Sequence, residues 1–268
     1  MSDSRTKLAI SGAAGRMGKR LIDLGSQDEF FQIVAAIEAS DHRDLGSDAG
    51  LAAGIGEMGL VFSDQYPAEV DVVIDFSHPA GAAAAVDYCV EHRKPLVMAT
   101  TGLHESTIEK IKQAGHQIGV VWAPSMSLAV NLTMKLVETA ALALKDHATG
   151  VDVEIIERHH RFKADAPSGT ALKFGEIVAQ VMGQTNHQHG RDGMVGERGR
   201  NEIGYHAIRC GDNPGQHTIV FGMLGETIEL NVAASNRDCY AAGALAAARF
   251  VAAQGAGLYD MYDVLRLG

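Results

Sequence analysis

A glycine-rich turn near the amino terminus limits the possible folds of this chain more than any other feature. It follows the apolar run Leu8-Ala9-Ile10, precedes a helical pattern, and reads Gly12-Ala13-Ala14-Gly15-Arg16-Met17-Gly18. Glycines spaced three apart permit a tight turn and let backbone N–H groups approach a pyrophosphate closely. The last glycine, Gly18, could instead serve helix–strand packing alone. The turn predicts the first strand and helix of a dinucleotide-binding domain.

An acidic residue after the second apolar run supports this prediction. Ile33–Ile37 is typical of a buried strand, and Glu38 follows it, about 20 residues after Gly18. An acidic side chain at this place accepts hydrogen bonds from the adenosine ribose of a dinucleotide. The predicted cofactor contacts near this end of the chain are therefore Gly12, Ala13, Ala14, Gly15, Arg16, Met17 and Glu38.

The remainder of the first half alternates short apolar runs with helical segments. Val70–Phe76, Pro95–Met98 and Ile118–Trp122 are expected strands, and the stretch 46–59 is expected to be a surface loop. Short apolar strands separated by helices indicate a parallel sheet covered on both faces. Ligands bind such sheets at the carboxyl ends of the strands. The loops after the last two strands are therefore predicted to contact the nicotinamide, through Ala99, Thr100, Thr101, Ala123, Pro124, Ser125 and Met126.

The pattern changes near residue 127. A long helix is expected from about 128 to 145, and residues 183–201 are expected to form a mobile loop. Three strand-like segments then follow in series, which predicts antiparallel pairing within a mixed sheet: Ile203–Cys210, Gln216–Leu224 and Thr227–Ala234. We therefore expect an α/β protein with one domain formed by residues 1–127 and 238–268 and a second, α+β domain formed by residues 128–237.

The segment Glu157–Thr170 concentrates polar chemistry after an apolar strand-like run. It contains His159, His160 and Lys163, and it ends in a Ser-Gly-Thr turn at the expected start of a helix. Histidine exchanges protons near neutral pH, and lysine and arginine are fixed partners for anions. The N–H groups at a helix start favour a bound carboxylate or phosphate. The segment is thus predicted to hold a small anion and to protonate it.

Charge and cysteine content restrict the class of partner and compartment. The chain has 268 residues, a formal net charge of −10 and three cysteines that are far apart. A net negative charge argues against nucleic acid as the main partner, and the cysteine spacing gives neither a disulfide framework nor a zinc site. No apolar span is long enough to cross a membrane, and no signal peptide is recognisable. These features favour a cytoplasmic protein with a small anionic ligand.

With both motifs in view, the chain resembles the 4-hydroxy-tetrahydrodipicolinate reductase (dihydrodipicolinate reductase) family of diaminopimelate and lysine biosynthesis. The resemblance is carried almost end to end by the glycine turn, by Ala99–Gly102, by Glu157–Thr170 and by Gly257–Met261. It implies a Rossmann domain and an α+β domain for substrate binding and oligomerisation, with the last helix returning to the first domain. It also implies a homotetramer, NADH or NADPH as cofactor, and a cyclic dicarboxylic imine bearing a hydroxyl as substrate.

The resemblance further implies individual roles in the second half of the chain. His159 and Lys163 match the catalytic histidine and lysine of the family. The expected contacts to the substrate carboxylates are His160, Ser168, Gly169, Thr170 and Arg237. Water leaves and hydride is added, so a positioned acid must meet the charge that develops on the imine.

Two alternatives remain open at this stage. The chain could be another two-domain dehydrogenase of amino-acid metabolism, of the aspartate or homoserine type, or a non-catalytic protein that senses dinucleotides. Glu157–Thr170 argues against the first alternative, and the second would not need His159 together with Lys163. His187 and His189 form a His-x-His pair without a third ligand, so no metal site is predicted there.

Overall fold

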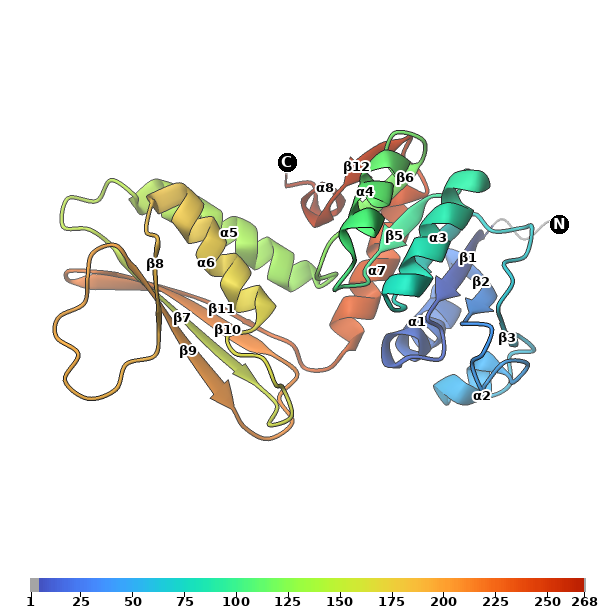
Figure 1. The fold of residues 1–268 in the computed structure, drawn as a ribbon, viewed down its shortest axis with the longest axis horizontal. Helices are drawn as coiled ribbons and strands as arrows, with labels where there is room; N and C mark the ends of the chain where they lie inside the picture. Colours follow the sequence, from blue (N-terminus) through green and yellow to red (C-terminus); the bar gives the residue numbers. More distant parts are fainter. Residues whose placement is uncertain (1–4, 268) are drawn as a thin grey trace. The chain divides into compact units, whose positions relative to one another are not determined.

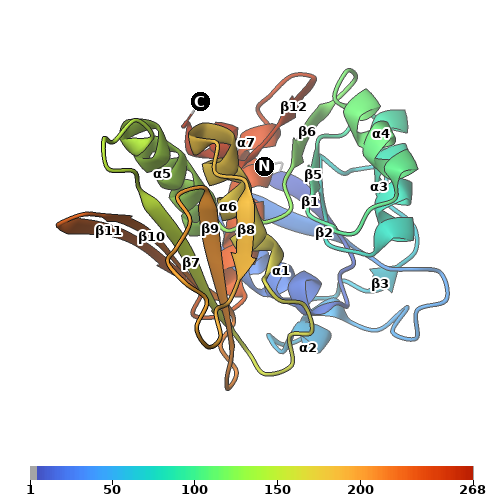
Figure 2. The same ribbon diagram turned by 60° about the vertical axis from the view of Figure 1, so that its left-hand side comes forward.

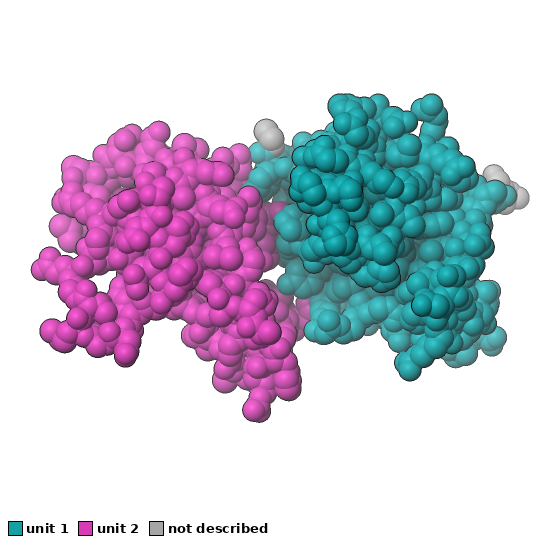
Figure 3. Space-filling model, viewed as in Figure 1, with its two compact units in different colours: residues 1–128, 237–268 teal, residues 129–236 magenta. Residues whose placement is uncertain are grey.

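Two compact units make up the chain in the computed structural model, which describes residues 5–267. Unit 1 takes in the residues up to 128 and those from 237 onward, and unit 2 holds residues 129–236 (Figure 3). Within residues 5–267, none of the helices combines the length and apolar character needed to cross a bilayer.

A parallel sheet forms the centre of unit 1. Its strand order is β12-β6-β5-β4-β1-β2-β3, and every neighbouring pair is parallel. The strands are β1 (Thr6–Ser11), β2 (Phe31–Ile37), β3 (Phe62–Ser63), β4 (Val72–Asp75), β5 (Leu96–Met98), β6 (Gly119–Trp122) and β12 (Gly257–Tyr259). The chain order reverses on either side of β1, and the carboxyl ends of β1 and β4 meet at this switch point, where sheets of this kind bind ligands.

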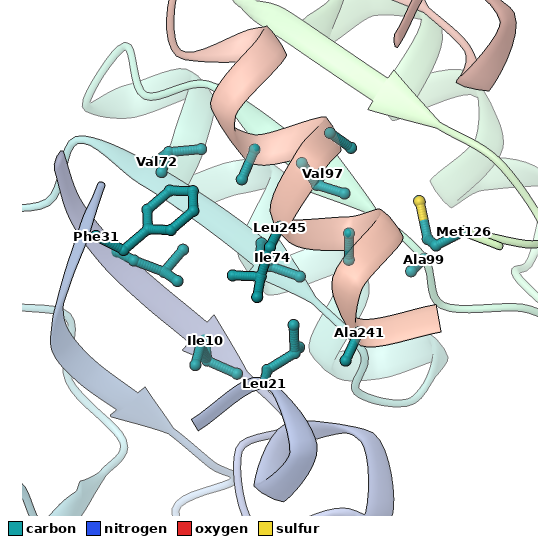
Figure 4. Close-up of a cluster of buried hydrophobic side chains, with 14 of the residues drawn as sticks. Ile10, Leu21, Phe31, Val72, Ile74, Val97, Ala99, Met126, Ala241 and Leu245 are labelled. Atoms are coloured by element: carbon teal, nitrogen blue, oxygen red, sulfur yellow. The ribbon is translucent and has the colours of Figure 1, made fainter. Parts of the chain in front are cut away.

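Helices cover both faces of this sheet because successive apolar side chains of its strands point to opposite faces and form two cores. Leu8 and Ile10 of β1 face α1 and α7, whereas Ala9 faces α3 and α4. Figure 4 shows the first of these cores, with Leu245 of α7 beside Ile74 of β4. The helices of unit 1 are α1 (Arg16–Gln27), α2 (Ala49–Ala53), α3 (Pro79–Glu91), α4 (Glu105–Ala114), α7 (Asp238–Val251) and α8 (Met261–Leu265).

Unit 2 contains a five-stranded mixed sheet with helices on one side (Figures 1 and 2). Its elements are α5 (Leu128–Leu144), β7 (Asp152–His159), α6 (Gly169–Met182), β8 (Asn186–His189), β9 (Glu202–Arg209), β10 (Gln216–Met223) and β11 (Glu226–Ala233). The strand order is β11-β10-β7-β9-β8. Alternate residues of β7 are buried, among them Ile155, Glu157 and His159, so this strand carries polar side chains on the covered face of the sheet.

Three predictions about local structure need correction. β10 and β11 pair antiparallel as expected, but β9 and β10 do not pair with each other. Strand β7 lies between them, antiparallel to β10 and parallel to β9. The expected loop 183–201 contains β8, which pairs with β9, so it is not structureless. The expected surface loop 46–59 contains α2, which begins at an Asp48 cap and ends at Gly54. The pairing of β7 and β8 with β9 depends on segments distant in sequence, and α2 depends on its Asp48 cap.

Candidate active site

The glycine turn of unit 1 depends on close backbone packing. Gly12 has φ +75°, and a Cβ built on it would lie 2.6 Å from the carbonyl oxygen of Phe76. At Gly18 a Cβ would lie 2.3 Å from the carbonyl oxygen of Gly12. A side chain at either position would therefore displace backbone atoms. For Gly18 this favours the packing role over direct contact with a ligand.

The start of α1 lies beside Glu38 and offers a place for an anion. The N-cap residue Gly15 has no side chain, so it does not cap the first N–H groups of the helix. Glu38 accepts a hydrogen bond from the Ala14 N–H at 2.7 Å, which places the carboxylate at the turn. A pocket of about 390 Å³ adjoins these residues and is lined in part by Ser11, Gly12, Glu38 and Ala39. This arrangement fits the adenosine end of a dinucleotide.

A buried carboxylate joins two strand ends beside this pocket. Asp75 is the last residue of β4 and is fully buried, and it accepts hydrogen bonds from Thr100 at 2.5 Å and from Ser77 at 2.7 Å. Burial raises the pKa of Asp75, although these hydrogen bonds oppose the shift. The contact of Asp75 with Thr100 ties the loop after β5, which holds Ala99 and Thr101, to the switch point.

The loop after β6 packs tightly against α7. Ala123 and Met126 are buried, while Pro124 is exposed. A Cβ on Gly243 of α7 would lie only 1.7 Å from the carbonyl oxygen of Met126, so a glycine is required where the helix crosses this loop. Ser125 lies in the same loop. The two loops predicted to contact the nicotinamide thus follow β5 and β6 of one parallel sheet, and buried contacts hold both of them in place.

In unit 2, His159 lies at the end of β7 against a buried carboxylate. Its Nδ1 is 2.6 Å from Glu157 Oε2, and Glu157 is only 1% exposed. The Nδ1 therefore donates, which leaves Nε2 as the nitrogen that can exchange a proton. Burial lowers the pKa of His159, although the Glu157 carboxylate acts in the opposite direction. The ring is thus neutral near pH 7 when no anion is bound beside it.

The start of α6 is fixed by a second buried histidine. Ser168 is the N-cap of α6, and its Oγ accepts a hydrogen bond from the Ala171 N–H at 3.1 Å. The same hydroxyl lies 2.9 Å from Nε2 of His217 and forms a hydrogen bond with it. Burial lowers the pKa of His217 to about 4, so the ring is neutral near pH 7. Gly169 and Thr170 follow as the first residues of the helix, where N–H groups lack intrahelical partners.

Lys163 and His160 lie in the loop that connects β7 to α6. Lys163 Nζ donates to Asp165 Oδ1 at 2.8 Å, and the Lys163 N–H donates to the His160 carbonyl. His160 Nδ1 is buried and has no hydrogen-bond partner among residues 5–267. A buried polar atom without a partner is costly, so this nitrogen is a ready contact for a bound polar ligand.

Two further features of the sequence belong to other elements of the chain. Arg237 is exposed and stands at the N-cap position of α7, which belongs to unit 1. His187 and His189 both stack on Tyr205 instead of converging on a common point. No group of three potential metal ligands occurs in the part of the chain that the structure describes.

Sequence reasoning assigned no role to several polar residues in these clusters, namely Asp75, Glu157, Arg209 and His217. Arg209 and His217 lie on β9 and β10, 52 and 60 residues after Glu157 in sequence. The only local signal was a polar residue among the alternating apolar residues of a strand, which by itself does not reveal a partner.

Comparison with known proteins gives a consistent result over the whole chain. The family models described as dihydrodipicolinate reductase, N-terminus and C-terminus, match residues 6–126 and 129–265. The 4-hydroxy-tetrahydrodipicolinate reductase of Rhodopirellula baltica is 58% identical over 99% of this chain and 98% of its own length. That of Alkalilimnicola ehrlichii is 46% identical, covering 98% of this chain and 99% of its own length.

A solved structure shares the fold. Dihydrodipicolinate reductase from Paenisporosarcina sp. TG-14, with dipicolinate bound, superposes with a TM-score of 0.77 at 23% identity. The match covers 97% of this chain and 98% of that protein. Together with the two domain matches, these relatives show that the chain belongs to the dihydrodipicolinate reductase family.

Proposed function

We propose that this chain reduces 4-hydroxy-tetrahydrodipicolinate to tetrahydrodipicolinate, with loss of water and with NADH or NADPH as reductant, in diaminopimelate and lysine biosynthesis. The observation that carries the proposal is the pairing of His159 with the buried Glu157 in a chain of this family. The pair leaves Nε2 of His159 as the single exchangeable ring nitrogen. A proton source of defined orientation is what an imine reduction requires.

The cofactor is assigned to the switch point of unit 1. The uncapped start of α1, from Gly15 to Met17, suits the pyrophosphate, and Glu38 suits the ribose. The loops Ala99–Thr101 and Ala123–Met126 are assigned to the nicotinamide, which supplies the hydride when the cofactor is bound. The role of the chain here is to orient the ring, and the buried Asp75–Thr100 hydrogen bond fixes one of the two loops that do so.

The substrate is assigned to the polar cluster of unit 2. Gly169, Thr170 and Ser168 at the start of α6, together with His160, are proposed to bind its carboxylates, and Arg237 remains a further candidate. His159 is proposed to hold the proton at Nε2, and Lys163 to stabilise the negative charge that develops on the imine. A dianionic substrate near His159 would raise the pKa of the ring, which favours the protonated form that can donate.

The two alternatives from the sequence fit less well. Neither an aspartate- or homoserine-type dehydrogenase nor a dinucleotide sensor explains why the buried Glu157 holds His159 in one orientation. Family membership also favours the reductase.

We further propose a cytoplasmic homotetramer that assembles through the sheet of unit 2 and does not bind nucleic acid or membranes. The face of that sheet away from α6 carries Ile156 and Ile208, which are 36% and 38% exposed. Exposed apolar side chains on a sheet face suit a contact between copies of the chain. Native mass spectrometry of the chain and of an Ile156→Glu variant tests the assembly. A wild-type monomer would contradict it.

The activity is tested by mixing the chain and NADH or NADPH with the condensation product of pyruvate and aspartate semialdehyde. The proposal predicts loss of nicotinamide absorbance that depends on this product. It also predicts that excess dipicolinate inhibits the reaction. If the cofactor is not consumed with any preparation that a known reductase accepts, the proposed function is wrong.

A further inference from the structure

A single buried carboxylate organises the polar cluster of unit 2. Both oxygens of Glu157 accept two hydrogen bonds each. Arg209 donates to Oε2 at 2.8 Å and to Oε1 at 2.7 Å, the Ser168 N–H donates to Oε1 at 3.1 Å, and His159 Nδ1 donates to Oε2. A carboxylate that is 1% exposed is tolerated only when it is fully hydrogen-bonded and paired with a charge.

These contacts keep Glu157 ionised. Burial opposes ionisation, but the hydrogen bonds from Arg209 and His159 outweigh it and lower the pKa of Glu157. An ionised Glu157 is an acceptor only, so the proton shared with His159 resides on Nδ1.

The other ring nitrogen of His159, Nε2, faces a glycine, Gly215. A Cβ built on Gly215, just before β10, would lie 3.0 Å from Nε2 of His159. The glycine thus leaves space at the nitrogen that must meet a substrate.

The same carboxylate also holds the start of α6. The Ser168 N–H donates to Glu157, while the Ser168 hydroxyl binds Ala171 and His217. Arg209 in addition donates to the Asp165 carbonyl at 2.6 Å, in the loop that carries Lys163. The strand end with His159, the loop and the helix start are therefore connected through Glu157 and Arg209.

We propose that Glu157 is a positioning residue, with Arg209 as its required counter-ion, that holds the proton donor His159 and the anion-binding start of α6 in fixed relation. The proposal rests on the proposed function. It assigns to Glu157 two effects that a residue important only for packing would not have: the tautomer of His159, and the binding of dicarboxylates at α6.

The test compares Glu157→Gln with Glu154→Gln. Glu154 lies on the same strand and is also paired with arginines, Arg191 and Arg198, but its side chain alternates to the other face of the sheet. We expect Glu157→Gln to lower kcat about 100-fold and to weaken dipicolinate binding about tenfold, with NADH affinity unchanged. We expect Glu154→Gln to keep kcat within about twofold of the wild type.

A second readout does not depend on activity. Nitrogen-15 NMR of the histidine rings should show His159 of the wild type with its proton on Nδ1, and the Glu157→Gln variant with a mixture of tautomers. If His159 keeps the Nδ1–H tautomer in that variant and kcat stays within about threefold, the proposal is overturned. If the wild type is inactive but the tautomer changes as expected, the proposed function fails while the positioning role stands.

A milder variant covers the case in which Glu157→Gln does not fold. Arg209→Lys keeps the positive charge but cannot reproduce the paired hydrogen bonds to both carboxylate oxygens. It should lower kcat about tenfold and leave His159 in the Nδ1–H tautomer. Wild-type kcat and wild-type dipicolinate affinity in this variant would contradict the role of Arg209.

Discussion

The glycine turn of unit 1 and the Glu157 cluster of unit 2, which are the two proposed anion sites, differ in how they are built. The turn relies on backbone N–H groups and on the absence of side chains, since a Cβ on Gly12 or Gly18 would meet backbone atoms. The cluster relies on buried side chains whose charges balance, with Glu157 between Arg209 and His159. In the proposed function, the turn therefore binds an anion without exchanging a proton, whereas the cluster can couple anion binding to protonation of His159.

The largest expected effect is a loss of turnover when His159 or Lys163 of unit 2 is replaced, with cofactor binding at the glycine turn unchanged. His159→Ala or Lys163→Ala should lower kcat by about two to four orders of magnitude, because an acid or a charge-stabilising group is lost. The dissociation constant of NADH should stay within about twofold, since neither residue belongs to the turn. Steady-state kinetics and fluorescence titration measure both. Lys173→Ala, an exposed paired lysine on α6, is the control and should retain activity. Near-normal turnover in His159→Ala would move the proton donor elsewhere.

A substitution in the glycine turn should instead affect stability and cofactor binding. Gly18→Ala places a Cβ 2.5 Å from the Ala13 Cα, so we expect a loss of about 3 kcal/mol in the free energy of unfolding together with weaker NADH binding. Urea unfolding and cofactor titration are the measurements. Gly255→Ala, where no atom lies within 4 Å of the added Cβ, should change neither. A Gly18→Ala variant as stable as the wild type would show that the packing at the turn is looser than described.

The cluster should also give unit 2 a distinctive dependence on pH. The pKa of His217 is about 4 in the folded chain against an ordinary 6.5, so the unfolded chain binds the proton first as pH falls. The resulting stability is present above pH 6.5 and is lost as pH falls toward 4, by about 2 kcal/mol at pH 5. Urea unfolding of wild type and His217→Gln at pH 7 and pH 5 should show a smaller decrease in the variant. The exposed His116→Gln is the control, and identical decreases in all three proteins would refute the assignment.

The turn could be predicted from the sequence and the cluster only in part, for a physical reason. The turn is local: Gly12 to Gly18 and Glu38 lie in one strand–helix–strand unit, so spacing alone predicts the place of the cofactor. The N-cap of α6 at Ser168 also depends on local sequence, and a helix start was expected there. The pairing of Glu157 with Arg209 depends on β9 lying beside β7, and no local pattern encodes that register.

The smallest effect concerns the choice between NADH and NADPH. Ala39 follows Glu38 and is exposed, and Arg43, the nearest following arginine, has a side chain that is 89% exposed. Neither residue thus provides a fixed cation beside Glu38, and Glu38 would repel a 2′-phosphate. We expect NADH to be used at least as well as NADPH, and Ala39→Arg to shift kcat/KM toward NADPH by about tenfold. A tenfold preference of the wild type for NADPH would contradict this and indicate Arg16, Lys19 or Arg43 as the phosphate ligand.

Proton uptake on ligand binding tests the contrast between the two regions most directly. Glu157, Lys163, Arg209 and His217 surround His159, and burial keeps its pKa below the ordinary value. Calorimetric titration in buffers of different ionisation enthalpy should show dipicolinate binding with uptake of about 0.5 to 1 proton at pH 7, and NADH binding with almost none. His159→Gln should abolish the uptake. Dipicolinate binding without proton uptake, or equal uptake in the His159→Gln variant, would contradict the account.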